Sequence, residues 1–587
     1  MSKVCVKKAR FQACTVLFLG GFLLLCGRLF FLQVLQAGTI AEEVATVRKR
    51  LVRMEAKRGE ILDRNGNLLA GTRSRILLGA DPQTVDLEDR GQLGLLAGIL
   101  DLPYGELIEN LARRERIDSA GNRRQVRWVP LKEIDEDLYR SVQGLGIRGV
   151  YGNRRYERYY PGRELGAHLI GYINKEETPV MGVEHALDYY LRGQPGWRET
   201  EVDGRRREMA AFREREVEPR SGLDVELTLD LFVQSVVESA MKELVKATHP
   251  EGASIIVSDP RTGDILGMAN YPTFDPNNFW EYPLENQRNR ALTDQYEPGS
   301  TFKIVPVSAA LEEGLLGPDT LIDCGKERIV FNGVDIRMPT DHRNLGQVPV
   351  RTVVAKSSNR GAATIGMMLG EDRMHDYARR FGFGERCGWP LRGEIAGNLM
   401  PVNKWDGLTI SRLPTGYAIG ATPIQVHQAM SAIANDGVRL RPKLLRRVID
   451  PREEVSLPLE PERGERVISK ETARMMREML VAVVGREGTA LRAELPGYAV
   501  AGKTGTSRKI IDGQYSASHH FGSFSGFFPA DNPRVVITVV VDDAQVSGPA
   551  YGGVVAAPTF RNIGEKLIPH LAIRKPENWE PFLVSND

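Results

Sequence analysis

ASIIVSDPRTGDILGMAN, residues 253–270, decides the fold. Two apolar runs flank the turn residues Arg261–Gly263, which predicts a β-hairpin. Just before it, residues 225–245 (VELTLDLFVQSVVESAMKELV) predict a strand that runs into an amphipathic helix. Helical patterns then continue to about residue 480, and the chain turns strand-rich in YAVAGKTGTS, SFSGFFPA and RVVITVVVDD. This order predicts an α+β domain whose first and last strands share an antiparallel sheet.

The region before this domain, residues 36–222, is charged and irregular. Within it, RGEILDRNGNLLA (residues 58–70) predicts two strands joined by an Asn-Gly turn. The stretch Arg198–Arg220 is dense in both signs of charge, which is typical of a solvated ribbon or linker.

Bulk composition narrows the class of protein. With 587 residues the chain is long enough for two or three domains, and a net charge of +2 gives no reason to expect a nucleic-acid partner. Five cysteines are too few for a disulfide-rich scaffold, and three of them lie within the first 26 residues. Of the other two, Cys324 and Cys387, two separate buried thiols are favoured over a disulfide pair.

The N-terminus carries a candidate membrane segment. Residues 13–27 (ACTVLFLGGFLLLCG) are apolar or weakly polar, and after Arg28 the run continues to Leu35, which gives the roughly 20 residues that a bilayer requires. Four basic residues and no acid occur among the first ten residues, so the positive-inside rule predicts a cytoplasmic N-terminus. A second basic cluster at residues 48–53 runs against this orientation.

A cleaved signal peptide and a lipoprotein site are the alternatives to an anchor. No A-x-A-like cleavage site follows the apolar run, and bulky Leu25 precedes Cys26 where a lipoprotein would have a small residue. We therefore expect a cytoplasmic tail at 1–10, an uncleaved anchor at 11–35, and an extracytoplasmic remainder.

The first chemical motif is EPGSTFK, residues 297–303. Pro298-Gly299 predicts a turn into a helix, and Ser300 and Lys303, three residues apart, would share one helix face. A lysine amine can deprotonate a serine only if burial and the helix N-terminus lower its pKa toward neutrality. Pro306 follows inside the expected helix, removes one N–H and could kink it.

Two further motifs follow. Ser357-Ser358-Asn359 comes after VRTVVAK, and its first serine and asparagine suit a proton relay and a substrate clamp, although alone the pattern is typical of a helix cap. Lys503-Thr504-Gly505-Thr506 lies on a predicted strand. Gly505 would allow close backbone approach there, and an edge strand could pair with an extended peptide.

Each motif alone is weak, but the three in this order are specific. With Leu227–Gln234, Arg288–Lys303, Gly420–Gly437 and Tyr551–Phe560, they make the chain resemble a class B, monofunctional penicillin-binding protein over essentially its whole length. RG-x-I-x-DRNG-x-x-LA in the N-terminal part resembles the non-catalytic pedestal of that family.

The resemblance implies a fold and a set of domains. We expect a single transmembrane helix, an elongated mostly-β pedestal of the dimerisation type at 36–222, and a transpeptidase domain at 223–570. That domain would have the fold of serine β-lactamases, an antiparallel sheet flanked by helices, with a tail at 571–587.

The resemblance also implies residue roles. Ser300 would be the nucleophile and Lys303 its base, while Ser357 and Asn359 would assist proton transfer and hold the substrate amide. Lys503 and Thr504 would orient the substrate carboxylate, and the N–H groups of Ser300 and Thr506 would form the oxyanion hole. The substrate would be the D-Ala-D-Ala stem peptide of lipid-linked or nascent peptidoglycan, β-lactams would be inhibitors, and no metal or cofactor is expected.

Several local stretches resemble the division type of class B enzyme, namely RNRALTDQYEPGSTFK, DHRNLGQVPVRTVVAKSSN and YGGVVAAPTF. A septal role would require glycan strands from a partner, which we expect to be a SEDS-type glycosyltransferase among other division-complex membrane proteins.

Three rival functions remain open. A β-lactamase would need a water-activating acid, and GEIAGN (393–398) places Glu394 four residues before Asn398, but Gly397 replaces the leucine expected there. A bifunctional enzyme would need a glycosyltransferase motif, which residues 36–222 do not show. The third rival is a β-lactam receptor or a catalytically silent scaffold. The short expected cytoplasmic tail leaves no signalling module for a receptor, and the intact motifs argue against a silent scaffold.

Overall fold

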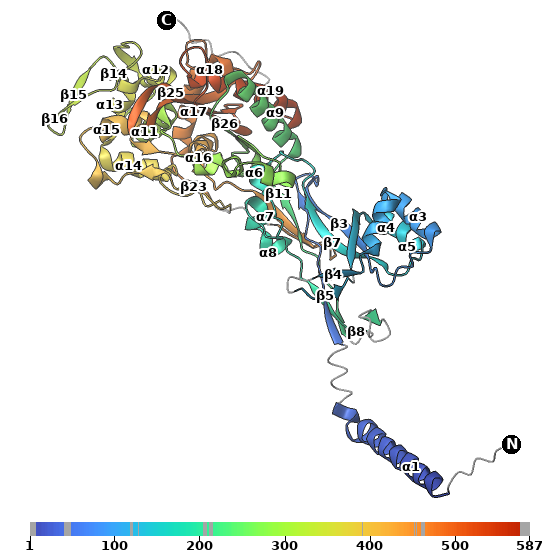
Figure 1. Cartoon of the computed structure of the whole chain (residues 1–587). Helices are drawn as coiled ribbons and strands as arrows, with labels where there is room; N and C mark the ends of the chain where they lie inside the picture. The colour runs from blue at the N-terminus through green and yellow to red at the C-terminus, as the bar shows by residue number, and fades with distance from the viewer. Residues whose placement is uncertain are drawn as a thin grey trace. The chain divides into compact units, whose positions relative to one another are not determined.

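The computed structural model describes residues 8–39, 49–117, 121–126, 128–202, 208–209, 215–389, 391–450, 452–453, 455–458 and 464–575. The chain divides into two compact units (Figure 1). The smaller unit comprises Met1–Lys57 and Arg192–Gly222, and the larger comprises Arg58–Leu191 and Leu223–Asp587. The expected tails at 1–10 and 571–587 lie outside the described residues, except for 8–10 and 571–575.

The smaller unit contains the apolar helix. α1 (Lys8–Phe30) continues into a π-helical turn, η1 (Phe31–Leu35). Among the described residues, Arg10–Leu35 is the one helical segment long and apolar enough to cross a membrane. The segment overlaps residues 11–35, and its role as a membrane anchor stays a prediction.

A small antiparallel sheet completes this unit, in the order β1-β8-β10, with β9 also paired to β8. Its strands are β1 (Lys49–Met54), β8 (Gly196–Val202), β9 (Glu208–Met209) and β10 (Arg215–Val217). The charged stretch 198–220 therefore contains strands, and its residues 203–207 and 210–214 lie outside the described part of the chain.

The larger unit is built around a five-stranded antiparallel sheet in the order β13-β12-β26-β25-β24. The strands are β12 (Gly252–Ser258), β13 (Ile265–Tyr271), β24 (Ala501–Ile511), β25 (Gln514–Phe528) and β26 (Val535–Asp542). β12 pairs with β26 from Gly252↔Asp542 to Ser258↔Val536, which confirms that strands from the two ends of the domain share one sheet. β24 lies at the edge.

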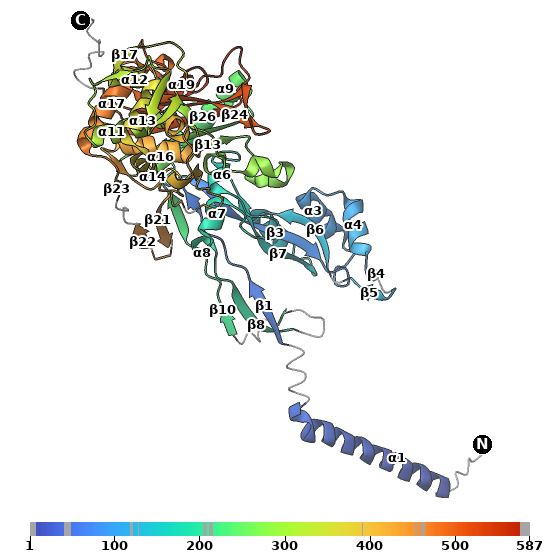
Figure 2. The same ribbon diagram turned by 90° about the vertical axis from the view of Figure 1, so that its left-hand side faces the viewer.

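Helices cover this sheet, and Figures 1 and 2 both show α9 and α16 separated by β26. α16 is anchored by buried His427, whose ring nitrogens bond Ser258 Oγ at 2.7 Å and Thr538 Oγ1 at 2.9 Å. The main helices are α9 (Leu231–Thr248), α11 (Ile304–Glu312), α12 (Val350–Ala355), α13 (Asn359–Leu369), α14 (Glu371–Arg380), α16 (Pro423–Ala434), α17 (Lys470–Val484) and α19 (Ala557–His570).

A second sheet joins the N-terminal part of the larger unit to its C-terminal part, in the order β22-β21-β11-β2-β3-β6, with β7 also paired to β3. Its strands are β2 (Ile61–Leu62), β3 (Leu68–Ala80), β6 (Val129–Ile134), β7 (Val150–Tyr159), β11 (Asp224–Leu227), β21 (Leu445–Asp450) and β22 (Val455–Pro458). Buried Asp63 accepts the N–H groups of Asn65 and Asn67, each at 2.8 Å, and so closes the predicted Asn-Gly hairpin.

Three helices of the N-terminal part were not anticipated from its sequence: α3 (Arg90–Leu100), α4 (Tyr104–Ala112) and α5 (Glu136–Gly144). They lie together beside β3 and β7 (Figure 1). Leucines such as Leu93, Leu100 and Leu107 form a separate core with Ile76 and Leu78 of β3.

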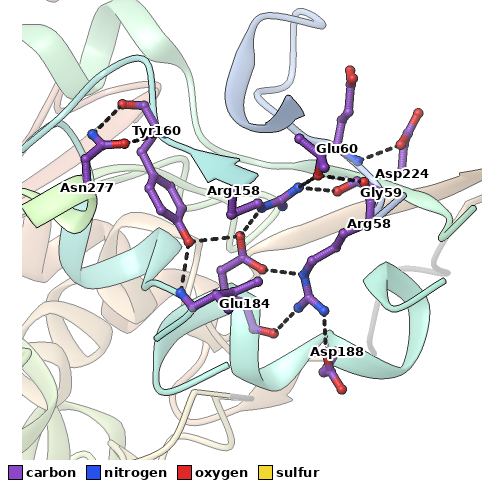
Figure 3. A network of polar contacts seen from close by, with 11 residues as sticks. Arg58, Gly59, Glu60, Arg158, Tyr160, Glu184, Asp188, Asp224 and Asn277 are labelled. Atoms are coloured by element: carbon purple, nitrogen blue, oxygen red, sulfur yellow. Dashed lines mark hydrogen bonds and ion pairs between the residues drawn. The ribbon is translucent and has the colours of Figure 1, made fainter. Parts of the chain in front are cut away.

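A buried ionic network in the N-terminal part of the larger unit joins Arg58, Arg158 and Glu184 (Figure 3). Glu184 is fully buried, and its carboxylate accepts the Nε–H of Arg58 at 2.8 Å and that of Arg158 at 2.6 Å. Tyr160 and Asn277 exchange two hydrogen bonds of 3.0 Å, which link the network to the domain that carries the five-stranded sheet. Burying these charges is tolerable because each has a partner.

Cys324 and Cys387 are both buried and both free. This confirms two separate thiols.

Candidate active site

Ser300 and Lys303 lie on one short 3₁₀ helix, η5 (Gly299–Lys303), that runs directly into α11. Residues i and i+3 eclipse in a 3₁₀ helix, so the two side chains share a face as the sequence predicted. Pro306 has no N–H to bond the carbonyl of Phe302, four residues back, and the segment before Ile304 is accordingly 3₁₀ rather than α-helical. Lys303 is buried, whereas Ser300 is partly exposed.

The structure confirms the helix-cap interpretation of Ser357-Ser358-Asn359, and the proton relay and substrate clamp stay predictions. Ser358 is the N-cap of α13, and its Oγ accepts the N–H of Gly361 at 2.9 Å. Ser357 has a φ of +59°, which is uncommon for a residue other than glycine. The chain therefore turns sharply enough for Ser357 and Asn359 both to bond Lys303 while Ser358 caps the helix.

Asp341, which sequence reasoning missed, holds this turn in place. Its carboxylate accepts the Ser358 hydroxyl at 2.6 Å and the Asn359 N–H at 2.5 Å. The Asn359 amide group is fixed from its other end by a 2.8 Å bond to the carbonyl of Thr340, so its oxygen is left for Lys303. No spacing rule points to Asp341, which lies in an irregular loop.

Two buried lysines meet at Ser357. Lys303 Nζ donates to the Ser357 carbonyl at 2.5 Å, to Asn359 Oδ1 at 2.7 Å and to Ser357 Oγ at 3.2 Å. Lys503 Nζ donates to the same Ser357 Oγ at 2.8 Å. We call these four residues, Lys303, Ser357, Asn359 and Lys503, the lysine centre.

Electrostatics at the lysine centre favour neutral amines. Burial lowers the pKa of Lys303 to about 7, against the opposing attraction of Asp341. Burial, with the charge of Lys303, also lowers the pKa of Lys503 well below its usual value. An amine that is half neutral near pH 7 beside a bridging hydroxyl can accept a proton and pass it on.

The Lys503–Thr506 strand lies against the start of the serine helix. A methyl group at Gly505 would come within 2.8 Å of the Pro298 carbonyl oxygen and 3.0 Å of Thr301, so Gly505 gives the clearance expected of it. Gly299 has a φ of +55°, and a methyl group there would lie 2.7 Å from the Thr506 carbonyl oxygen. The backbones of Ser300 and Thr506 are thereby held close together.

The two threonines of this strand are supported by neighbouring groups. Buried Thr504 shares a 2.8 Å hydrogen bond with Thr489, hydroxyl to hydroxyl. Thr506 is partly exposed, and its Oγ1 accepts the N–H of Gly552 at 3.2 Å.

Ser300, the remaining predicted catalytic residue, makes no hydrogen bond to the lysine centre. Its hydroxyl has no hydrogen-bond partner among the residues that the structure describes. Contacts between a nucleophile and its base are often long before substrate binds. The structure thus brings the lysine centre together by direct bonds and places Ser300 one helical turn before Lys303.

Glu394 has a structural task. It is buried, and its carboxylate accepts the backbone N–H of Cys387. Burial and this carboxylate raise the pKa of the Cys387 thiol. Glu394 makes no bond to the lysine centre within the described part of the chain, which speaks against a lactamase-type water-activating acid.

Family models and curated relatives both assign the chain to the penicillin-binding proteins. Residues 253–565 match the family model of the penicillin-binding protein transpeptidase domain, and residues 53–227 match that of the penicillin-binding protein dimerisation domain. The chain is 31% identical over 563 residues to stage V sporulation protein D of Bacillus subtilis, with 95% of this chain and 85% of that protein covered. It is 30% identical over 544 residues to the peptidoglycan D,D-transpeptidase FtsI of Escherichia coli, with coverages of 91% and 87%.

Solved structures agree with these relatives. Penicillin-binding protein 3 of Mycobacterium tuberculosis, in complex with aztreonam, superposes with a TM-score of 0.66 at 29% identity, covering 89% of this chain and 98% of that one. Penicillin-binding protein 2X of Streptococcus thermophilus, at 22% identity and a TM-score of 0.76, shares the fold.

Proposed function

The chain belongs to the penicillin-binding proteins that pair a dimerisation domain with a transpeptidase domain, and we propose that Ser300 is the nucleophile of its reaction. The protein is a serine-type peptidoglycan D,D-transpeptidase. The observation that carries the assignment of residues is the buried Lys303 amine, with a pKa of about 7, one helical turn after Ser300.

In the acylation step, neutral Lys303 takes the proton of the Ser300 hydroxyl, and Ser300 Oγ attacks the carbonyl carbon between the two terminal D-Ala residues of a stem peptide. The negative charge that develops on the carbonyl oxygen is stabilised by the N–H groups of Ser300 and Thr506. Collapse of this intermediate breaks the amide bond, forms the acyl-enzyme and releases D-Ala. The leaving nitrogen receives its proton through Ser357, which the hydrogen bonds from Lys303 and Lys503 suit to a relay.

The edge strand β24 is the proposed binding site of the peptide. An extended peptide would add to its free edge by backbone hydrogen bonds. Lys503, Thr504 and Thr506 would orient the terminal carboxylate by donating hydrogen bonds to it, with Gly505 leaving room between the two threonines. Asn359 would hold the substrate amide.

In the second step, an amine of a neighbouring stem peptide attacks the acyl-enzyme carbonyl, forms the cross-link and frees Ser300. A β-lactam would acylate Ser300 in the same way and remain attached. The M. tuberculosis relative solved with aztreonam supports this inhibitor class for the present chain.

We propose a location and partners as well. The apolar segment Arg10–Leu35 would anchor the protein once in the cytoplasmic (inner) membrane, with the N-terminus inside and the catalytic domain outside. A septal role fits the similarity to the FtsI transpeptidase of E. coli, and we favour it over side-wall elongation. Glycan strands would then come from a SEDS-type glycosyltransferase within the division complex.

The direct test is D-Ala release from a synthetic stem pentapeptide by the purified full-length protein in detergent. Wild type is expected to release D-Ala, and Ser300→Ala is expected to release none. Ser141→Ala, which removes an exposed serine hydroxyl from α5, is the matched control and should keep wild-type activity. Release by Ser300→Ala at the wild-type rate would refute the assignment.

A further inference from the structure

A polar cavity of about 320 Å³ lies in the larger unit and shares no residue with the lysine centre. Its volume falls at the lower end of small-ligand pockets, which span ~300–1,000 Å³. Six segments line it: the β2–β3 turn, the start of α9, the β12–β13 turn, strand β13 itself, the approach to β26 and the end of α19. The charged side chains among the lining residues are Arg64, Asp230, Asp259, Arg261, Arg534 and His570.

Both carboxylates of the cavity already have hydrogen-bond partners within the protein. Asp259 accepts the Nε–H of Arg261 at 3.0 Å and its Nη2–H at 2.7 Å. Asp230 caps α9 through the N–H groups of Phe232 and Val233, and its other oxygen bonds His570 Nε2 at 2.9 Å. Neither acid is therefore left to balance a further cation.

Two arginines of the cavity remain without such a partner. Within the described part of the chain, the guanidinium groups of Arg64 and Arg534 make no hydrogen bond and no ion pair, and Arg534 Nε is buried and unsatisfied. The backbone of Arg64 is nevertheless fixed, because its N–H bonds the Leu229 carbonyl at 2.8 Å and its carbonyl accepts Arg446 Nη1 at 2.8 Å. The side chains that line the cavity thus carry more positive than negative charge. Burial raises the pKa of Asp264, which does not line the cavity, against the attraction of Lys443 and Arg64, so this acid offsets part of the excess.

We propose that this cavity is a binding site for a phosphate-type oxyanion. A guanidinium presents its N–H groups in a planar fork that matches phosphate oxygens, and an unsatisfied buried Nε–H is costly until an acceptor arrives. The volume leaves room for a group attached to the phosphate, so the natural source is either inorganic phosphate or a sugar phosphate. The site is independent of the catalytic assignment.

The oxyanion would act as a bridge. Arg64 lies in the part of the chain matched by the dimerisation-domain model, and Arg261 and Arg534 lie in the part matched by the transpeptidase-domain model. One anion held by Arg64 and Arg534 would join these two parts beside the shared sheet. A ligand that binds only the folded protein stabilises it by RT ln(1 + [L]/Kd) and so raises the midpoint of unfolding as the ligand concentration rises.

The test is isothermal titration of the full-length protein in non-ionic detergent, at constant ionic strength, with inorganic phosphate, glucose 1-phosphate and acetate as separate probes. Saturable binding of at least one phosphate probe is expected. Arg534→Gln and Arg64→Gln should each weaken it about tenfold or more, because each removes charge-assisted hydrogen bonds. Arg492→Gln, which removes an exposed charge that does not line the cavity, should bind like wild type.

Tighter binding of the sugar phosphate would identify a phosphorylated sugar as the source, and equal binding would identify free phosphate. No saturable binding of either phosphate probe, binding of acetate as tight as that of phosphate, or equal affinity in all four proteins would overturn the proposal. Labelling of each variant by fluorescent penicillin reports separately that the domain is folded and that the catalytic assignment stands. Arg64 lies in a turn, so Arg64→Gln is expected to fold. The test can therefore be carried out with Arg64→Gln alone if Arg534→Gln does not fold.

Discussion

Lys503 Nζ and Ser357 Oγ are joined by a 2.8 Å hydrogen bond although the two residues are 146 positions apart in the chain. The bond ties the edge strand β24 to the turn before α13. Because Lys303 donates to the same oxygen from a third element, Ser357 is the point at which the three sequence motifs meet.

Lys303→Ala should slow acylation by fluorescent penicillin at least about 100-fold, the lower range for loss of a general base. The fold should survive, since removing a buried amine also removes its desolvation cost. Lys356→Ala is the matched control, because that lysine lies next to Ser357 in sequence but bonds Glu487 instead. Labelling of Lys303→Ala at the wild-type rate, with a normal thermal transition, would show that Lys303 is not the base.

The acylation rate should follow the titration of Lys303. Below a pKa of about 7 the amine is protonated and cannot accept the serine proton, so the rate should rise about tenfold per pH unit up to that point and level off above it. The measurement is the second-order rate constant for fluorescent penicillin between pH 5.5 and 9. A rate that is flat or falls between pH 6 and 8 would be inconsistent with this role.

Glu184→Ala should destabilise the larger unit strongly. It leaves Arg58 and Arg158 without their shared buried acid, and removing one partner of such a network costs about 3–5 kcal/mol. Glu157→Ala, which removes an exposed acid one residue before Arg158, should cost less than about 1 kcal/mol. Thermal unfolding of both variants is the comparison, and equal small shifts would mean that the network contributes little.

Depletion of the protein tests its proposed biological role. If it builds septa, depleted cells should grow into filaments without septa, which microscopy with a wall stain would reveal. Rounded cells with normal septa would instead indicate a role in elongation and leave the chemistry untouched.

Much of the fold could be predicted from local signals. The hairpin at 253–270 and the Asn65-Gly66 turn are encoded by neighbouring residues, and both are where the sequence predicts them. The helices α3 to α5 were missed because the surrounding charge obscured short runs of leucine spaced for a helix.

The sequence predicts which motif residues belong to the site, but it does not predict their hydrogen-bond partners or their arrangement in space. The sequence motifs identify Ser300, Ser357 and Lys503, but roles for these residues stay predictions until they are tested. Asp341 and Glu184 could not be found from the sequence, because each acts through partners distant in the chain or through a loop without a spacing rule. Buried polar networks depend on tertiary contacts, which local patterns do not encode.

The most direct test of the central claim is to locate the covalent adduct of a β-lactam. Full-length protein is treated with penicillin, digested, and mapped by tandem mass spectrometry. The account predicts one adduct, on Ser300, that is absent from Ser300→Ala. An adduct on any other serine, or an equal adduct on Ser300→Ala, would contradict it.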